Sequence, residues 1–309
     1  MREKYLKLNS KFKIGDVQIG GRYGEIPTVL IGSIFYMRHK IVEDSQKGIF
    51  SEIKAREIIE KSTSLANKLG VKFMLDVVGE TTEALVKYME FLYYQTNVPL
   101  LVNSTSPEVR IGVLQHLHKK DMLDRVVYNS INAFSTEEEL KLLKQIPVET
   151  AVLQAYNSKS KRANGPLKVL CGNDKSKGLL DLALECNIHN VLVDVPTLDL
   201  ASVGLVARSL QLVQEQFAVP VGTAPSNGTY DSQWLRNREN VSKNQFRNVD
   251  AAVNAYLASH GANFLFYGPV EGFEWVFPAT AVVNAMHAYG LRSDGVKPET
   301  SEHPFFKIL

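Results

Sequence analysis

The sequence predicts an α/β protein that folds as a (β/α)8 TIM barrel, in a single domain that covers residues 1–309. Eight short apolar runs alternate with helical stretches along the chain. The runs lack a period-two alternation of apolar and polar residues, which is typical of strands buried on both faces of a parallel sheet. Eight β/α units in roughly 250 residues match the usual size of a TIM barrel.

Residues 1–24 are expected to form an extension ahead of the barrel. The segment FKIGDVQIGG alternates apolar and polar residues around Gly15 and Asp16. This pattern predicts a short β-hairpin. We expect the hairpin to close the N-terminal end of the barrel.

The eight apolar runs, in order, are TVLIGSIF, KFMLDVVG, PLLVNST, RVVYNSI, TAVLQAY, NVLVDV, VPVGTA and NFLFYG. Helices are expected at 51–69, from Thr82, from Pro107, from Ser135, and at 179–187, 201–217, 249–260 and 279–289. Gly70 suits a helix stop, Pro107 suits a first helical position, and the acids after Ser135 suit a helix N-terminus. An open, doubly wound sheet is the alternative fold, but no GxGxxG turn follows the first run.

Composition excludes several classes of function. The formal charge is +2, from 35 basic and 33 acidic residues, so no nucleic-acid or membrane-surface partner is expected. No apolar run approaches the ~20 residues of a membrane-spanning helix. Cys171 and Cys186 lie outside any CxxC or metal-ligand spacing. With a polar N-terminus, these features predict a cytoplasmic protein without disulfides.

The active site of a TIM barrel lies at the C-terminal ends of its strands. In this sequence the residues at those ends are acids, amides and hydroxyls: Asp76, Glu80, Asn103, Ser104, Ser106, Asn129, Ser130, Asn132, Gln154, Asn157, Asp194, Ser226, Asn227, Tyr267 and Glu271. No lysine ends a run, which argues against a Schiff-base aldolase. No His or Cys cluster is present for zinc, and no histidine follows a run as a Ser-His-Asp triad needs.

Carboxylates and amides suit a neutral, flat, polar heterocycle. A pterin presents a ring N–H beside an exocyclic NH2, and one carboxylate can accept hydrogen bonds from both. Amides can serve the edges that mix donors and acceptors. The sequence therefore predicts a pterin site without a bound metal ion.

Structural roles remain open for the same residues. An acid or hydroxyl at a strand end often caps the next helix. This alternative applies to Asp76, Asp194, Glu80, Ser104 and Ser106. Asn103 and Asn129 could be structural amides at the rim of the barrel. His39 could be packed or lie at the rim of a ligand site, and Trp234 could be packed or contact a partner protein. Lys159–Arg162 could be a solvated basic loop.

Longer motifs carry a family resemblance. The segment GEIPTVLIGSIFYMRHKIVED resembles the opening of the H subunit of tetrahydromethanopterin S-methyltransferase. DVVGETTEA, NSTSPEVR, YNSIN, FLFYGPVEG, WVFPA and EHPFFKIL extend the likeness over nearly the whole chain. The loop PVGTAPSNGTY and the segment 158–178 differ from that subunit. Within the first of these, TAPSN resembles the soluble tetrahydrofolate enzymes. The chain as a whole therefore resembles the stand-alone branch, which includes the methylcorrinoid:tetrahydrofolate methyltransferases of bacterial glycine betaine demethylation.

The resemblance implies an activity and roles for site residues. It implies methyl transfer from a methyl-Co(III) corrinoid, carried by a partner protein, to N5 of tetrahydrofolate, with 5-methyltetrahydrofolate and a Co(I) corrinoid as products. Asp76 and Asp194 fall on pterin-binding aspartates, and Asn227 falls on the asparagine that approaches N5. Ser106 stands where the related enzymes have a pterin-binding asparagine. Asn103, Asn129 and Gln154 complete the expected pterin site, and a homodimer is expected.

Three other functions stay open at this point. A pterin synthase of the dihydropteroate type would need a basic anion pocket, which the strand ends lack. A non-catalytic docking subunit of a larger complex would not need the polar strand ends. A tetrahydromethanopterin-specific subunit would share the site and differ in the pterin.

Overall fold

The computed structural model describes residues 5–174, 176–237 and 239–309. Among these residues, eight parallel strands form a closed barrel in the order β3-β6-β7-β8-β9-β12-β13-β14. The strands are β3 (Val29–Ile34), β6 (Phe73–Val78), β7 (Leu100–Asn103), β8 (Val126–Asn132), β9 (Thr150–Gln154), β12 (Asn190–Asp194), β13 (Val221–Thr223) and β14 (Phe264–Pro269). Closure between β14 and β3 confirms the predicted TIM barrel and excludes the open sheet.

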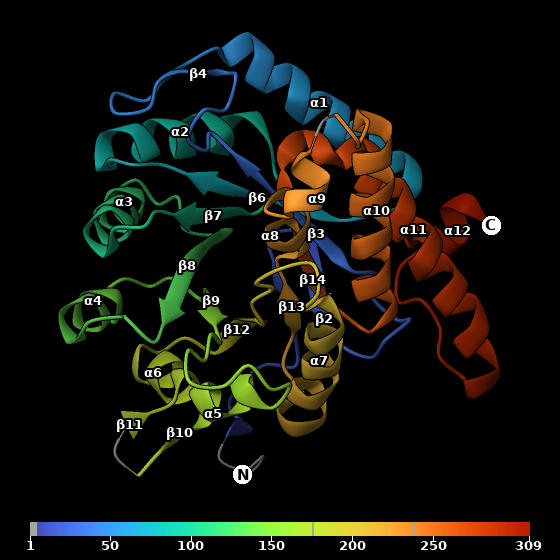
Figure 1. Cartoon of the computed structure of the whole chain (residues 1–309). Helices are drawn as coiled ribbons and strands as arrows, with labels where there is room; N and C mark the ends of the chain where they lie inside the picture. Colours follow the sequence, from blue (N-terminus) through green and yellow to red (C-terminus); the bar gives the residue numbers. More distant parts are fainter. Residues whose placement is uncertain (1–4, 175, 238) are drawn as a thin grey trace.

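The helices surround the strands on the outside of the barrel (Figure 1). They are α1 (Glu52–Leu69), α2 (Thr82–Gln95), α3 (Pro107–Lys119), α4 (Glu137–Leu143), α5 (Gly165–Cys171), α6 (Leu179–Glu185), α7 (Val203–Phe217), α8 (Pro225–Tyr230), α9 (Gln233–Arg236), α10 (Lys243–Ser259), α11 (Phe273–Gly290) and α12 (Pro304–Ile308). Within the described ranges, no helix has the length and apolar character needed to cross a membrane.

Several boundaries differ from the sequence-based expectation. The segment between β13 and the helix expected from 249 contains α8 and α9. Helix α10 begins at Lys243 rather than at 249 because Ser242 and Gln245 form a capping box. The loop 158–178 contains α5 and a small antiparallel pair, β10 (Gly172–Asn173) and β11 (Ser176–Lys177). A second unexpected pair, β4 (Val42–Asp44) and β5 (Ile49–Phe50), lies between β3 and α1.

Helix α11 also begins earlier than expected, at Phe273 rather than at 279. Pro278 lies inside this helix, where a proline usually ends or kinks a helical pattern. The turn before it stays helical while Val276 and Phe277 are fully buried in the core. Tertiary packing therefore overrides the local signal.

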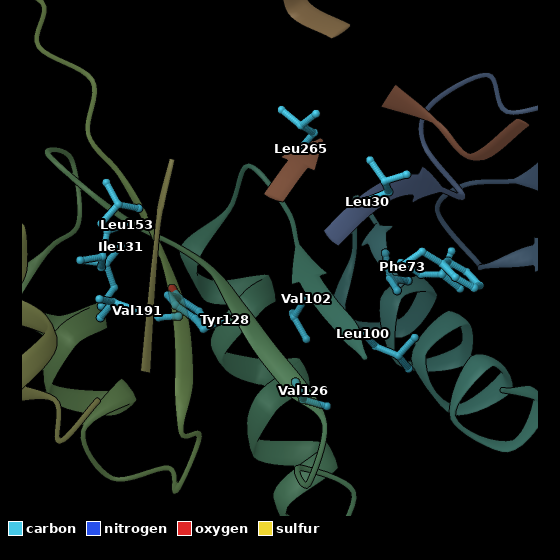
Figure 2. Close-up of a cluster of buried hydrophobic side chains, with 14 of the residues drawn as sticks. Leu30, Phe73, Leu100, Val102, Val126, Tyr128, Ile131, Leu153, Val191 and Leu265 are labelled. Carbon is cyan, nitrogen blue, oxygen red and sulfur yellow. The ribbon is translucent and has the colours of Figure 1, made fainter. Parts of the chain in front are cut away.

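Side chains that alternate along each strand divide the core into two layers. The outer layer lies between strands and helices, and Figure 2 shows part of it, with Leu30, Val102 and Leu265 from three different strands. The inner layer fills the barrel and includes the apolar side chains Val29, Ile31, Met74, Leu101, Val127, Val152, Leu192, Phe264 and Phe266. Both faces of each strand are thus buried, as the sequence predicts.

The N-terminal hairpin consists of β1 (Lys11–Ile14) and β2 (Val17–Gly20). Its side chains Ile14, Val17 and Ile19 belong to the inner layer of the barrel. Asn9, just before the hairpin, donates its backbone N–H to the carbonyl of His189, which precedes β12. The hairpin therefore closes the N-terminal end, as expected, and leaves the opposite end open for a site.

Gly32 in β3 leaves room for a fully buried tyrosine. A Cβ at this position would lie 2.2 Å from the hydroxyl oxygen of Tyr267, whose side chain has no exposed surface. We expect Gly32→Ala to lower the free energy of unfolding by about 1–3 kcal/mol, the usual cost of overpacking, in urea denaturation. Gly204→Ala is the control, because no atom lies within 4 Å of that position. Equal stability of the two variants would contradict this account.

Candidate active site

A polar layer lies above the apolar inner layer at the C-terminal end of the barrel. In six neighbouring strands, the residue two positions after an inner-layer side chain is polar, and the strand period of two points both into the barrel. These polar residues are Ser33, Asp76, Asn103, Asn129, Gln154 and Asp194. All six line one open cleft of about 660 Å³. The structure thus brings together five of the predicted strand-end residues in this layer, with Ser33 added, whereas Glu80, Ser106, Asn157, Tyr267 and Glu271 are not among the described residues that line the cleft.

Asp76 at the end of β6 organises one half of this cleft. Its carboxylate is 3% exposed and accepts hydrogen bonds from Ser33 Oγ at 3.0 Å, Asn103 Nδ2 at 2.9 Å and Asn129 Nδ2 at 3.0 Å. Burial raises the pKa of Asp76, and these three donors oppose that shift. The donors come from β3, β7 and β8, so Asp76 is not a helix cap. It fixes the amide groups of Asn103 and Asn129 toward β6.

Asp194 at the end of β12 is buried with fewer partners. Its Oδ1 atom has no hydrogen-bond partner in the part of the chain that the structure describes. Burial raises the pKa of Asp194 to about 7, and a hydrogen bond with Gln154 opposes the shift. Buried polar atoms in proteins are nearly always paired. An unpaired carboxylate oxygen on a residue that lines a cleft is therefore a position where a ligand donor fits.

The β13–β14 side of the cleft is built by helix α8. This helix carries Ser226 and Asn227, which both line the cleft. Asn227 is exposed at the mouth and lies in the first turn of the helix rather than in a loop. Ser226 Oγ donates to the carbonyl of Phe266 at 3.1 Å. This close approach needs Gly268, since a Cβ there would lie 2.8 Å from Ser226 Cβ.

A buried acid behind α8 holds this helix in place. Asp250 of α10 has no exposed surface and accepts from Thr229 Oγ1 at 2.5 Å and from Trp275 Nε1 at 2.7 Å. Burial raises the pKa of Asp250, and both hydrogen bonds oppose the shift. Thr229 lies two residues after Asn227 in α8. The network therefore ties the Asn227 helix to α10 and α11.

Other predicted candidates have structural roles. Ser106 is the N-cap of α3, where its Oγ accepts from the Val109 N–H at 3.2 Å, and it is not among the described residues that line the cleft. Ser104 does line the cleft. Glu80 accepts from Ser45 Oγ at 3.1 Å, while Thr81 caps α2.

His39 is packed rather than placed to bind a metal ion. Its Nδ1 accepts from the backbone N–H of Phe35 at 3.1 Å, so the proton of a neutral ring lies on Nε2, 2.9 Å from Glu271 Oε1. Tyr36 stacks on the imidazole with ring centroids 4.4 Å apart. Tyr36 lines the cleft, so His39 and Glu271 support one of its walls. Among the described residues, no group of three or more His, Cys, Asp or Glu side chains is placed to hold a metal ion.

Arg110 is the one Lys or Arg among the described residues that line the cleft. Its guanidinium donates to Glu139 Oε1 at 2.7 Å, to Tyr128 Oη at 3.0 Å and to the Ser104 carbonyl at 2.6 Å. Arg110 and Glu139 are both buried. A cation paired in this way is poorly available to a diphosphate, which argues against a synthase that binds one.

Sequence reasoning missed six polar residues of the cleft: Ser33, Tyr36, Thr105, Arg110, Tyr230 and Asp231. Ser33 follows the inner-layer residue Ile31 by two positions. The alternation that places Asp76 after Met74 was therefore also available in β3. Tyr36 and Arg110 reach the cleft from a loop and from α3, and no local pattern in the sequence indicates this.

Comparisons with known proteins identify the family. Residues 7–299 match the model of the tetrahydromethanopterin S-methyltransferase MtrH subunit. The H subunit of this enzyme from Methanopyrus kandleri is 34% identical over 301 residues, with 93% of this chain and 94% of the relative covered. The H subunit from Methanosarcina acetivorans is 34% identical, with 99% of each chain covered. The chain belongs to the MtrH family. The prediction of a methyltransferase is confirmed, because these relatives are named as methyltransferase subunits.

Solved structures support the fold of the MtrH-family barrel. A Yersinia pestis dihydropteroate synthase with a pterine–sulfa conjugate aligns with a TM-score of 0.61 and 14% identity, covering 90% of this chain and 99% of that one. The truncated 3-deoxy-D-arabino-heptulosonate 7-phosphate synthase from Thermotoga maritima aligns with a TM-score of 0.53 and 12% identity, covering 96% and 97%. At these identities the likeness concerns the fold alone.

The raised pKa of Asp194 makes a prediction about stability. An Asp in the unfolded chain ionises near pH 4, so the folded state is penalised progressively between about pH 4 and pH 7 and fully above pH 7. We expect Asp194→Asn to raise the Tm by several degrees at pH 8, with the gain shrinking toward pH 5. Thermal unfolding at both pH values measures this. Asp16→Asn, in the exposed hairpin turn, is the control, and a gain independent of pH would contradict the prediction.

Proposed function

We propose that this MtrH-family protein transfers a methyl group between N5 of a reduced pterin and a corrinoid carried by a partner protein. The observation that carries the proposal is the cleft of acids and amides with the unpaired, buried Asp194 Oδ1. For the pterin we propose tetrahydrofolate, as in the stand-alone branch of the family, with 5-methyltetrahydrofolate as the methylated product.

Asp194 and Asp76 would hold the pterin ring in different ways. The Asp194 carboxylate can accept from the ring N–H and the exocyclic NH2, which compensates its burial. Asp76 already accepts three protein hydrogen bonds, so roughly one of its acceptor positions remains. Through those bonds it orients Asn103 and Asn129, whose amide oxygens would meet further ring donors. Gln154, bonded to Asp194, would lie at the same edge of the ring.

Asn227 is proposed to act at the reacting nitrogen. In the direction that forms methyltetrahydrofolate, the N5 lone pair makes the new N–C bond while the bond from the methyl carbon to cobalt breaks. The corrinoid supplies the methyl group and retains the electron pair of the broken bond. Positive charge develops on N5, and the side-chain carbonyl of Asn227 at the mouth of the cleft would stabilise it as a preorganised dipole. The N5 proton then leaves to solvent, which gives neutral 5-methyltetrahydrofolate. The network of Thr229 and Asp250 keeps this amide in position.

The mouth of the barrel offers a surface for the corrinoid protein. Two loops and helix α9 carry large apolar side chains that are mostly exposed: Met37 at 64%, Phe134 at 77% and Trp234 at 58%. Exposed apolar side chains that gather on one face mark protein interaction sites. A partner that covers them would bring its corrinoid over the cleft, where N5 is presented.

Tetrahydromethanopterin is the second candidate pterin. The curated relatives from Methanopyrus and Methanosarcina are named for it. The acids and amides of the cleft would serve the pterin ring of either compound. Binding titrations with the two pterins under identical conditions distinguish the candidates.

We also propose a homodimer, which the family resemblance implies. Helix α11 presents Val282, Met286 and Tyr289 to solvent, at exposures of about one half or more. Spacings of four and three residues place them on one helix face. A second copy of the chain would cover this apolar surface, and sedimentation equilibrium of the purified protein tests it.

The decisive assay is spectroscopic. Methylcob(III)alamin, tetrahydrofolate and this protein together should produce the absorption of Co(I) cobalamin, and omission of either the pterin or the protein should prevent it. Tight pterin binding without any Co(I) signal, also when the corrinoid protein is supplied, would instead identify a non-catalytic docking subunit. Absence of pterin binding would overturn the proposal.

Two substitutions separate binding from catalysis. We expect Asp194→Ala to raise the Kd for the pterin about ten-fold, since pterin donors lose a charged acceptor worth roughly 1–3 kcal/mol. Asn227→Ala should slow single-turnover methyl transfer with a smaller loss of binding. Calorimetry and stopped-flow absorption measure the two effects, with the exposed Asn67→Ala on α1 as the control. Unchanged pterin affinity in Asp194→Ala, or a normal rate in Asn227→Ala, removes that residue from its role.

A further inference from the structure

We propose that a second pocket beside the cleft binds the substituent of the reduced pterin, an aromatic ring that carries an anionic chain. This inference rests on the proposed function, and it assigns the tail of the pterin to residues outside the barrel interior. We call this site the tail pocket. It is lined at its mouth by Tyr156, Lys161, Arg162, Leu198, Asp199 and Leu205.

The tail pocket and the cleft meet at the ends of the same two strands. Gln154 and Asp194 line the cleft, and the next residues, Ala155 and Val195, line the tail pocket. Because side chains alternate along a strand, the cleft lies on the inner side of β9 and β12 and the tail pocket on their helix side. The Ala155 N–H donates to the Asp194 carbonyl at 2.8 Å, so the two rims are adjacent. A ligand whose ring contacts Asp194 would therefore pass its substituent over this rim.

The lining of the tail pocket has two kinds of surface. Tyr156, Leu198 and Leu205 are large apolar residues with 36%, 46% and 49% exposure, so an aromatic ring would find apolar surface not covered by the protein. Lys161 and Arg162 are exposed at the same pocket and form no ion pair with a described residue. The one acid, Asp199, accepts from the Ser202 N–H at 2.7 Å. This combination suits an aryl group followed by carboxylates.

The pocket is formed in the protein without a ligand. Ser209 of α7, which is 3% exposed, donates its hydroxyl to the Ala163 carbonyl at 2.8 Å and so ties the basic loop to the helix. Asn157 Nδ2 donates to the Gly165 carbonyl at 3.0 Å. A Cβ on Gly165 would lie 2.6 Å from the Ser160 carbonyl oxygen, so the loop is tightly folded. The cavity of about 280 Å³ is slightly smaller than the usual small-molecule site of about 300–1,000 Å³, which suits part of a ligand rather than a whole one.

The test compares a pterin that has the tail with one that lacks it. Calorimetric Kd values are measured for tetrahydrofolate and for 6-methyltetrahydropterin, with wild-type protein and Lys161→Ala/Arg162→Ala. Loss of two exposed ion pairs, worth up to about 1 kcal/mol each, raises a Kd roughly five-fold to thirty-fold. We expect the double variant to raise the Kd for tetrahydrofolate by this factor and to change the Kd for 6-methyltetrahydropterin by less than about two-fold. Lys168→Ala/Arg208→Ala, which removes cations of α5 and α7 outside the pocket, is the matched control.

A second variant tests the apolar wall. Leu205→Glu places a carboxylate at the pocket and should weaken tetrahydrofolate binding while 6-methyltetrahydropterin binds as in the wild type. Equal changes in the Kd of both compounds, or no change in either Kd, would overturn the proposal that the tail pocket binds the pterin substituent. Wild-type protein that binds the two compounds equally tightly would overturn it as well and leave the proposed function intact. Wild-type protein that binds neither compound would remove the proposed function together with this inference.

Discussion

The site depends on one buried carboxylate. Asp76 is almost fully shielded from water, and a buried charge is tolerated only when it is well paired. Its partners are Ser33, Asn103 and Asn129, from three strands other than its own. One acid therefore links the ends of four neighbouring strands and sets the direction of two amides before any ligand arrives. Their hydrogen-bonding groups are held in a fixed geometry, which reduces the ordering that binding would otherwise require.

The opposite side of the cleft is built in another way. There the polar side chain is that of Asn227, which lies on α8, a short helix packed against β14 and α10 (Figure 1). Gly268 permits the close contact, and Asp250 anchors the helix from behind through Thr229. One side of the cleft thus consists of side chains on strands, and the other is a helix held by its neighbours. In the proposed reaction, the side chains on the strands bind the pterin ring, and the reacting nitrogen N5 faces helix α8.

The strand ends could be predicted from the sequence because the pattern is local. Polar residues such as Asp76 and Asp194 follow buried runs directly, and the strand period then points them into the barrel. The helices α5, α8 and α9 were not predicted, since helices of four to seven residues depend on tertiary contacts rather than on intrinsic propensity. The pairing of Arg110 with Glu139 joins α3 to α4, and it follows from the packing of two helices that no sequence pattern specifies. Ser106 has the right type and place for a ligand contact, yet its hydroxyl caps α3.

The distribution of charge explains which ligand the molecule would accept. Inside the cleft, Arg110 is paired with Glu139, and the Asp194 carboxyl has a pKa raised to about 7 by burial. An anionic ring would be repelled there, whereas a neutral ring with adjacent N–H groups would stabilise the ionised carboxylate. Outside the rim, Lys161 and Arg162 remain available beside apolar surface. In the proposed complex, a neutral ring and an anionic tail would thus be separated by the same pair of strands, whose inner side chains at the cleft are Gln154 and Asp194 and whose outer loops carry Lys161 and Arg162. The separation is what a reduced pterin with an acidic substituent requires, because its two ends need opposite electrostatic environments within one bound molecule.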